Sequence, residues 1–308
     1  MKVLVTGGAG FIGRWVTRNL LVRGHEVIAY DNLRNGNLRN IEEFRRNRRF
    51  KFLKGDVLDA RRLREVFRDV DACVHLAAQI NVQRSIDRPE ETFRNNVDGT
   101  FNVLEWCRRK DARLELVGTC LVYDASDGKP ISENHPLRPA SPYAGSKLAG
   151  EELALSYHRA YGLPVVVTRP FNTYGPFQRS DSEGGVVSIF IERKLRGLPI
   201  LVYGDGHQTR DLLYVEDCAD FIVRSLISKR AVGEVINAGT GRDVEINRLA
   251  LMICGEKGII KHVPHPHPQA EIRRLICDYS KAKKLLGWEP KTSLEEGIKK
   301  TEEWMAEK

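Results

Sequence analysis

A phenol and an amine lie one helical turn apart in the segment Tyr143-Ala144-Gly145-Ser146-Lys147. Apolar residues recur at spacings of three and four through residues 143–161, which predicts a helix that carries both side chains on neighbouring turns. A cation near a phenol favours the phenolate and lowers a pKa that starts at about 10. The pair can therefore supply a general base, although a Tyr and a Lys at this spacing also occur by chance in many helices.

A glycine-rich turn, Gly7-Gly8-Ala9-Gly10-Phe11-Ile12-Gly13, follows a short β-branched run and opens a helical pattern. Glycine is needed where a tight turn lets bare backbone N–H groups approach a pyrophosphate at a helix N-terminus. Glycine turns are common, so the position of this one between a strand and a helix is what makes it informative. We predict a dinucleotide site with contacts from Gly7, Gly10, Phe11, Ile12 and Gly13.

An acidic residue, Asp31, ends the second predicted strand, at about the distance past Gly13 where a carboxylate binds the adenosine ribose hydroxyls. Its charge would repel the extra phosphate of NADP, so the predicted cofactor is NAD. The alternative role for Asp31 is a turn cap before Asn32. The carboxyl ends of parallel strands line one crevice. Further cofactor contacts are therefore expected from Asn32, Asp56, Val57, Leu76, Ala77 and Ala78.

These residues need an α/β framework, and the first half of the chain alternates strand and helix patterns. Strands are predicted at residues 2–6, 26–30, 50–54, 72–76, 113–118 and 164–169, with helices at 10–23, 60–69, 93–110 and 143–161. This alternation indicates a Rossmann-type, doubly wound parallel sheet.

The pattern loosens beyond about residue 170, where isolated helices are predicted at 186–196, 216–228, 246–255 and 294–305. We therefore expect an NAD-binding domain over residues 1–170, to which 207–240 partly returns. Residues 171–308 are expected to form a smaller α/β substrate-binding lobe.

Composition narrows the class of protein. The chain has 308 residues and a formal net charge of +8, but its basic run at residues 45–49 lacks interleaved aromatic residues, so no nucleic-acid partner is expected. No apolar run is long enough to span a membrane and no signal-peptide pattern is present, which favours the cytoplasm. The six cysteines lack the spacing of a zinc site or of a disulfide scaffold, so we expect reduced thiols and no metal.

A hydroxyl at the end of the fifth predicted strand, Thr119, could share a proton with the substrate of the phenol. Other short motifs follow in order along the chain: His75-Leu76-Ala77-Ala78-Gln79, Asn96-Val97-Asp98-Gly99-Thr100, Arg169-Pro170-Phe171-Asn172-Thr173-Tyr174-Gly175-Pro176, Tyr203-Gly204-Asp205-Gly206, residues 209–217, 278–282 and 285–288. On these motifs the chain resembles the nucleotide-sugar epimerase/dehydratase branch of the extended short-chain dehydrogenase/reductase superfamily, over nearly its whole length.

The resemblance implies functions for several residues. Tyr143 would be the catalytic base, Lys147 would also hold the nicotinamide ribose, and Thr119 would hydrogen-bond the reacting hydroxyl. The family motif containing Asn96 belongs to the cofactor site. Asn172 and Arg210 would contact the phosphates and sugar of a nucleotide-diphosphate sugar, and a guanidinium is suited to phosphate. A homodimer through residues 93–110 and 143–161 is also implied.

One segment departs from the family. Where relatives often carry an Arg shortly before residues 271–273, this chain reads Pro264-His265-Pro266-His267-Pro268-Gln269. The second phosphate-binding residue is therefore open, and Arg273 or Arg274 could supply it.

The residues after Thr119 bear on the reaction. Related 4,6-dehydratases carry a Glu there, often with an Asp, whereas this chain has Cys120 and Leu121, and Leu121 cannot transfer a proton. We therefore expect epimerisation at C4 through a transient 4-keto sugar. A 4,6-dehydratase, a decarboxylating synthase, an epimerase at another carbon and a non-enzymatic NAD-sensing regulator are the alternatives. Intact Thr119, Tyr143 and Lys147 argue against the regulator.

The sugar is left open between UDP-glucose/UDP-galactose and UDP-glucuronate/UDP-galacturonate. Arg179 follows Tyr174-Gly175-Pro176, at a place where related UDP-glucuronate 4-epimerases have an Arg that would hold the C6 carboxylate. Those epimerases have a Thr where this chain has Asn172, which weakens the match. The alternative for Arg179 is a solvated loop residue.

Overall fold

A seven-stranded parallel sheet forms the larger part of the protein in a computed structural model, which describes residues 1–181, 184–255 and 258–307. Its strand order is β10-β6-β5-β4-β1-β2-β3, and each neighbouring pair is parallel. The strands are β1 (Lys2–Thr6), β2 (Glu26–Asp31), β3 (Phe50–Lys54), β4 (Ala72–His75), β5 (Arg113–Val117), β6 (Val165–Pro170) and β10 (Val235–Ala238).

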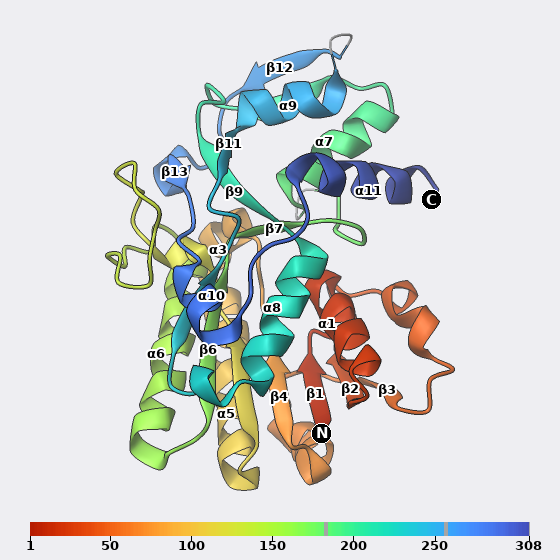
Figure 1. The fold of residues 1–308 in the computed structure, drawn as a ribbon, viewed down its shortest axis with the longest axis vertical. Coiled ribbons are helices and arrows are strands. Elements are labelled where there is room, and N and C mark those ends of the chain that lie inside the picture. Colours follow the sequence, from red (N-terminus) through yellow and green to blue (C-terminus); the bar gives the residue numbers. More distant parts are fainter. Residues whose placement is uncertain (182–183, 256–257, 308) are drawn as a thin grey trace.

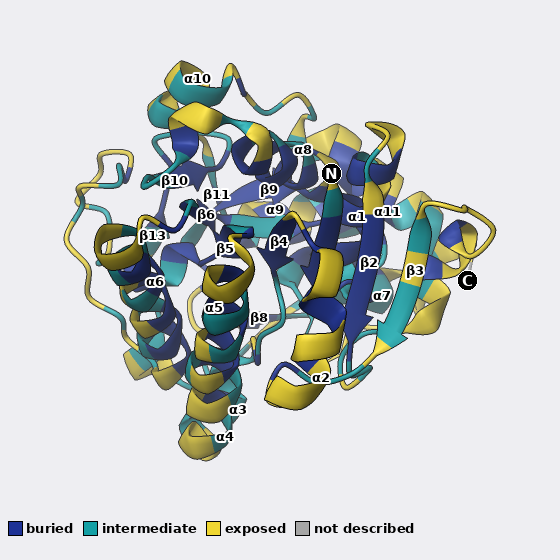
Figure 2. Ribbon diagram, turned by 90° about the horizontal axis from the view of Figure 1, so that it is seen from below, coloured by how far each residue is buried: buried dark blue, intermediate teal, exposed yellow. Residues whose placement is uncertain are grey.

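Helices cover both faces of this sheet because its strands are apolar on both sides (Figures 1 and 2). In β1, Val3 and Val5 belong to one buried cluster, whereas Leu4 belongs to the other. The first cluster includes residues of α1 (Phe11–Val22) and α8 (Val215–Ile227). The second includes residues of α2 (Ala60–Val66), α5 (Gly99–Lys110) and α6 (Pro142–Tyr161). The predicted doubly wound α/β fold is therefore confirmed.

A smaller lobe lies beyond the carboxyl ends of the strands (Figure 1). Its strands are β7 (Asn172–Tyr174), β8 (Ile200–Tyr203), β9 (Thr209–Tyr214), β11 (Asp243–Glu245), β12 (Ile260–Val263) and β13 (Arg274–Leu275). Strand β9 pairs with β7, β11 and β13, and β8 pairs with β12. Helices α7 (Val186–Leu195), α9 (Ile246–Cys254) and α11 (Leu294–Ala306) contribute to its separate buried cluster.

The segment between β4 and α5 is less regular than predicted. Instead of one helix over residues 93–110, it contains α3 (Val82–Asp87), α4 (Pro89–Phe93) and a π-helical turn (Arg94–Asp98) before α5 begins. The edge strand β10 was not predicted, and α10 (Ser280–Leu286) packs beside it. Among the described residues, no helix is both long and apolar enough to cross a bilayer.

Candidate active site

The glycine-rich turn forms a cradle in which backbone lies against backbone. Gly7 has φ +70°, and a Cβ there would lie 2.9 Å from the Ala77 backbone nitrogen. At Gly13 a Cβ would lie 2.1 Å from the Gly7 carbonyl oxygen. Side chains are therefore excluded from the start of α1, where backbone N–H groups can face a pyrophosphate. This arrangement fits a dinucleotide.

Asp31 is fixed at the end of β2 by two backbone donors. Its Oδ2 accepts from the Ala9 N–H at 3.1 Å and its Oδ1 accepts from the Leu33 N–H at 2.8 Å. Burial raises the pKa of this carboxyl, and both hydrogen bonds oppose the rise. Asp31 thus caps the turn, as the alternative interpretation had it, and also lines the cavity described next.

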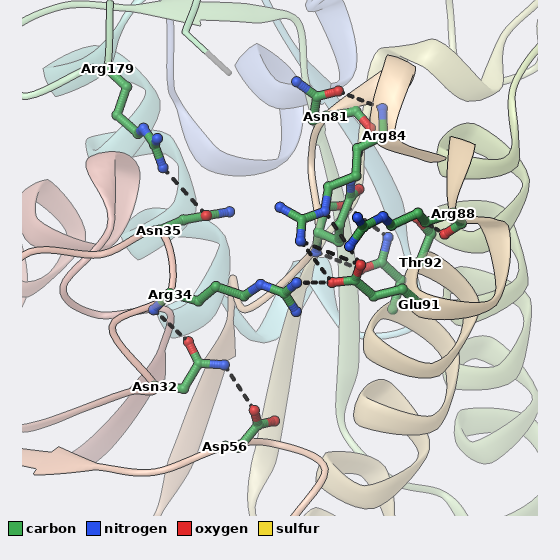
Figure 3. Close-up of polar contacts among 12 residues, drawn as sticks. Asn32, Arg34, Asn35, Asp56, Asn81, Arg84, Arg88, Glu91, Thr92 and Arg179 are labelled. Atoms are coloured by element: carbon green, nitrogen blue, oxygen red, sulfur yellow. Dashed lines mark hydrogen bonds and ion pairs between the residues drawn. The ribbon is translucent and has the colours of Figure 1, made fainter. Parts of the chain in front are cut away.

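A cavity of about 580 Å³ lies at the carboxyl edge of the sheet and brings most of the predicted cofactor residues together. Its lining includes Gly7, Gly10, Phe11, Ile12, Gly13, Asp31, Asn32, Val57, Leu76, Ala77 and Ala78. Asp56 lines an adjoining cavity and accepts a hydrogen bond from Asn32 Nδ2 at 2.8 Å (Figure 3). Sequence reasoning missed the contribution of the loop after β2, which adds Arg34, Asn35 and Gly36 to the cavity wall.

Asn96 joins the loop after β4 to α6 through side-chain hydrogen bonds. Its Oδ1 accepts from the Gln79 N–H at 2.7 Å, and its Nδ2 donates to the Gln79 carbonyl and to Ser146 Oγ, both at 2.9 Å. Since Ser146 lies between Tyr143 and Lys147, Asn96 ties the loop after β4 to the helix that carries both. The hydrogen bonds described for Asn96 join it to Gln79 and Ser146, so it holds the wall of the cavity in place.

The three predicted catalytic residues are all buried and meet where β5 ends and α6 begins. Ser141 caps α6 by accepting from the Ala144 N–H at 3.2 Å, which places Tyr143 in the first turn. Lys147 Nζ donates to the Val117 carbonyl at 2.6 Å. Thr119 follows that strand, and its side chain hydrogen-bonds with Tyr143.

Burial dominates the electrostatics of this group. It raises the pKa of Tyr143 to about 12, and the hydrogen bond with Thr119 opposes that rise. Burial also lowers the pKa of Lys147 to about 8, against the attraction of Glu151. The sequence predicted a lowered pKa for the phenol. In this structure the Lys147 ammonium is hydrogen-bonded to the Val117 carbonyl. Desolvation of the phenol therefore affects the pKa of Tyr143 more than the charge of Lys147 does.

A buried ion pair lies one turn further along α6. Glu151 Oε2 accepts from Arg169 Nη2 at 2.7 Å, and Arg169 Nη1 donates to the Tyr123 hydroxyl at 2.8 Å. That hydroxyl donates to Asn237 of β10, also at 2.8 Å. This network connects the catalytic helix with β6 and β10, and the sequence held no local signal for it because its members are distant along the chain.

On the smaller lobe, Arg210 of β9 lies beside Ile272, which packs in the same buried cluster as Cys120 of the loop after β5. Its positive charge acts on the buried Cys120 thiol, the residue after Thr119. Arg210 donates to the Ile272 carbonyl at 2.8 Å and forms an ion pair with Glu271. Glu271 also pairs with His265 Nε2 at 2.8 Å. Sequence reasoning missed Glu271, although it marked the His-containing segment as a departure from the family.

The other predicted substrate residues lie in different surroundings. Asn172 begins β7 and its Oδ1 is buried. The Arg273 side chain is 66% exposed and pairs with Asp205 at 2.9 Å. Arg274 pairs with Asp243 at 2.9 Å. The structure thus brings Arg210 close to the loop after β5, whereas the Arg273 guanidinium is held by Asp205 at an exposed position.

Arg179 lines the cofactor cavity, where it forms an ion pair with Asp181. Its Nη1 donates to Asn35 Oδ1 at 3.3 Å, so it faces the loop after β2 (Figure 3). A substrate carboxylate would compete with Asp181 for this guanidinium.

Comparison with known proteins identifies the family. A family model described as GDP-mannose 4,6 dehydratase matches residues 4–301. A crystal structure of Pal from Bacillus thuringiensis is 55% identical, covers 100% of this chain and 99% of its own, and superposes with a TM-score of 0.99. A UDP-glucuronic acid 4-epimerase from Bacillus cereus, solved with UDP-glucuronic acid and NAD, is 32% identical with a TM-score of 0.92, covering 100% and 99% of the two chains.

Curated relatives carry out more than one reaction. A putative UDP-glucose 4-epimerase from Methanocaldococcus jannaschii is 38% identical and covers 98% of both chains. A dTDP-glucose 4,6-dehydratase from Actinoplanes sp. is 36% identical over 99% of this chain and 97% of its own. A UDP-glucuronic acid decarboxylase 1 from Xenopus tropicalis is 35% identical over 97% and 71%. These names describe NAD-dependent nucleotide-sugar chemistry as a class, and the predicted cofactor NAD is confirmed.

Proposed function

Because this chain belongs to the GDP-mannose 4,6-dehydratase family of extended short-chain dehydrogenases/reductases, we propose that it is an NAD-dependent nucleotide-sugar 4-epimerase. The substrate would be a UDP-hexose or a UDP-hexuronate. Residues 171–308 would supply its contacts, above all Asn172 and Arg210.

The buried group at the start of α6 supports oxidation at C4. Tyr143 would act as a phenolate, which needs a cation close to its oxygen because burial raises its pKa to about 12. It would take the proton of the 4-hydroxyl while C4 loses hydride, and a 4-keto sugar would result. Thr119 would orient the hydroxyl. The Lys147 ammonium, which donates to the Val117 carbonyl in this structure, would hold the nicotinamide ribose and supply the positive charge on approaching the phenol. Bound NAD supplies the hydride acceptor and, on return, the donor. The ketose then turns so that hydride reaches the opposite face of C4, and Tyr143 gives its proton back.

The two residues after Thr119 favour epimerisation over elimination of water. Loss of water across C5 and C6 needs an acid and a base at those carbons. Leu121 has neither, and burial raises the pKa of the Cys120 thiol to about 12, so this thiol is a poor base at neutral pH. Return of the hydride to the same sugar is therefore the outcome that these side chains favour.

The quaternary structure proposed from the family is a homodimer through residues 93–110 and 143–161, which include the end of α4, all of α5 and most of α6. Large apolar side chains are exposed along this part of the surface: Phe93 is 54%, Phe101 45% and Tyr161 59% exposed. Light scattering at micromolar concentration should give twice the 35.0 kDa mass of the chain. A mass of one chain would contradict the dimer.

The test of the reaction is a product analysis. The purified protein is incubated separately with UDP-glucose, UDP-glucuronate and dTDP-glucose, and each product is identified by mass spectrometry and NMR. A 4-epimer with the mass of its substrate supports the proposal. A product lighter by one water or by carbon dioxide would assign a dehydratase or a decarboxylase instead.

A further inference from the structure

The loop after β2, residues 32–37, is fastened at two points across the cofactor cavity (Figure 3). Arg34 forms an ion pair with Glu91 of α4. The next residue, Asn35, accepts the hydrogen bond from Arg179 on the loop after β7. Two neighbouring residues of one loop are therefore tied to two segments that are remote in sequence and lie on different sides of the cavity.

Glu91 is the shared acceptor in the first of these ties. Arg84 of α3 donates from Nη2 to Glu91 Oε1 at 3.1 Å and to Oε2 at 3.3 Å. The Arg34 side chain is 47% exposed, whereas Arg84 and Glu91 are 27% and 24% exposed. Two guanidinium groups that share one partner repel one another, and the carboxylate between them offsets that repulsion. Arg34, Glu91 and Arg84 form what we call the ion-pair bridge.

The ion-pair bridge separates two cavities. Arg34 and Arg84 both line the cofactor cavity. Glu91 and Arg34 line the adjoining cavity of about 650 Å³, which also contains Asp56. Arg34 follows Asp31, the residue expected at the adenosine ribose, by one short turn. The bridge therefore crosses the cleft beside the adenosine half of a bound dinucleotide and connects that side with α3 and α4.

We propose that Glu91 is a positioning residue for cofactor retention: it holds Arg34 and Arg84 across the cleft, so that NAD leaves only when the ion-pair bridge opens. Retention suits a cycle that returns its hydride to the same sugar, because such a cycle needs no exchange of the cofactor. The inference concerns release of NAD and is independent of which carbon of the sugar reacts.

The experiment measures the rate of NAD release from the loaded protein. Holoenzyme is mixed with an excess of an auxiliary dehydrogenase and its substrate, which reduce every released NAD and report it by absorbance. Glu91→Gln should release NAD roughly 2- to 5-fold faster, as expected for a partly exposed ion-pair network. Added salt should speed release from the wild type more than from the variant. Glu65→Gln, which removes the exposed Arg62–Glu65 pair on α2, should leave the rate unchanged.

A double-mutant cycle distinguishes the bridge from general loosening of the fold. If Arg34 and Glu91 act together, the Arg34→Gln/Glu91→Gln double variant should release NAD no faster than the quicker single variant. An unchanged release rate in Glu91→Gln, or fully additive effects of the two substitutions, would overturn the proposal. So would faster release that is independent of salt and accompanied by a lower thermal midpoint than that of Glu65→Gln.

Discussion

The proposed cofactor side and the proposed substrate side of the site are assembled in different ways. On the cofactor side, Gly7, Gly13 and Asp31 come from the turn after β1, the first turn of α1 and the end of β2, and backbone groups of neighbouring segments fix them. On the substrate side, Arg210 is held by Glu271 and the Ile272 carbonyl, from a segment about 60 residues later in the chain. One side is organised by a sheet edge and the other by contacts between remote segments.

This difference has a consequence for function. A sheet edge with buried neighbours on both sides offers few alternative arrangements, so the same cofactor can be bound throughout a family. Residues 264–271 are exposed or half-buried and can vary without disturbing the sheet. We therefore expect substitutions on the cofactor side to alter NAD binding alone, and those on the substrate side to alter the nucleotide sugar alone. Residues between the two sides should affect turnover.

The largest effect is expected where the two sides meet. Tyr143→Phe removes the hydroxyl that we propose exchanges the proton but keeps the buried ring, so turnover should fall by about 10²- to 10⁴-fold. The NAD content of the purified variant should equal that of the wild type, because the ring and Lys147 remain. Steady-state kinetics and the absorbance of released cofactor check both points. Near-wild-type turnover would remove Tyr143 from the mechanism.

On the substrate side, Arg210→Ala should lower kcat/KM by roughly 10- to 150-fold through loss of a charged contact to the substrate phosphates. The matched control is Arg273→Ala, which removes an exposed guanidinium already paired with Asp205, and we expect less than about a threefold change. Comparable losses in the two variants would show that Arg273 also binds the diphosphate. NAD release should be unaffected in both variants.

Arg179 tests the nature of the sugar. If it binds a C6 carboxylate, Arg179→Ala should lower kcat/KM for UDP-glucuronate by roughly 10- to 150-fold and leave UDP-glucose unchanged. Since Asp181 competes for the guanidinium, Asp181→Asn should raise kcat/KM for UDP-glucuronate and leave kcat/KM for UDP-glucose unchanged. Equal losses on both sugars, or none on either, would leave the uronate substrate without support.

The smallest effect is expected for Asp31→Asn on the cofactor side. The amide keeps one acceptor oxygen but turns its NH2 group toward the N–H of Ala9 or Leu33. We therefore expect NAD affinity to fall by roughly fivefold, the size of one lost neutral hydrogen bond. Discrimination against NADP should weaken because the repelling charge is lost. Calorimetric titration of the NAD-free protein with each cofactor measures this ratio. An unchanged preference for NAD over NADP would mean that Asp31 acts only as a turn cap, which accepts from the Ala9 and Leu33 N–H groups.

Most of the sheet could be predicted from the sequence because its signals are local. Strands β1 and β3 have the predicted bounds, and the glycine turn and Asp31 lie together as expected. Strand β10 was missed because its apolar residues are too few to show a period, and only pairing with β6 reveals it. The interruption before α5 was missed because the π-helical turn at Arg94–Asp98 continues the helical pattern of apolar residues.

The substrate side could be predicted only in part. The type of residue indicated Arg210, but no spacing rule joins it to Glu271 or Glu271 to His265. Arg273 has the charge of a phosphate ligand, and its exposed pairing with Asp205 depends on the turn after β8. The ion-pair bridge is equally non-local, since Arg34 and Glu91 lie on opposite sides of the cleft.

The most direct test of the proposed chemistry follows hydrogen at C4. UDP-glucose and UDP-glucuronate carrying deuterium at C4 are converted in ordinary water, and the products are examined by NMR and mass spectrometry. Oxidation and return of the same hydride predict an inverted C4 that keeps its deuterium, in a product of unchanged mass. Loss of the deuterium to solvent, retained configuration at C4, or a product lighter by one water would contradict the 4-epimerase.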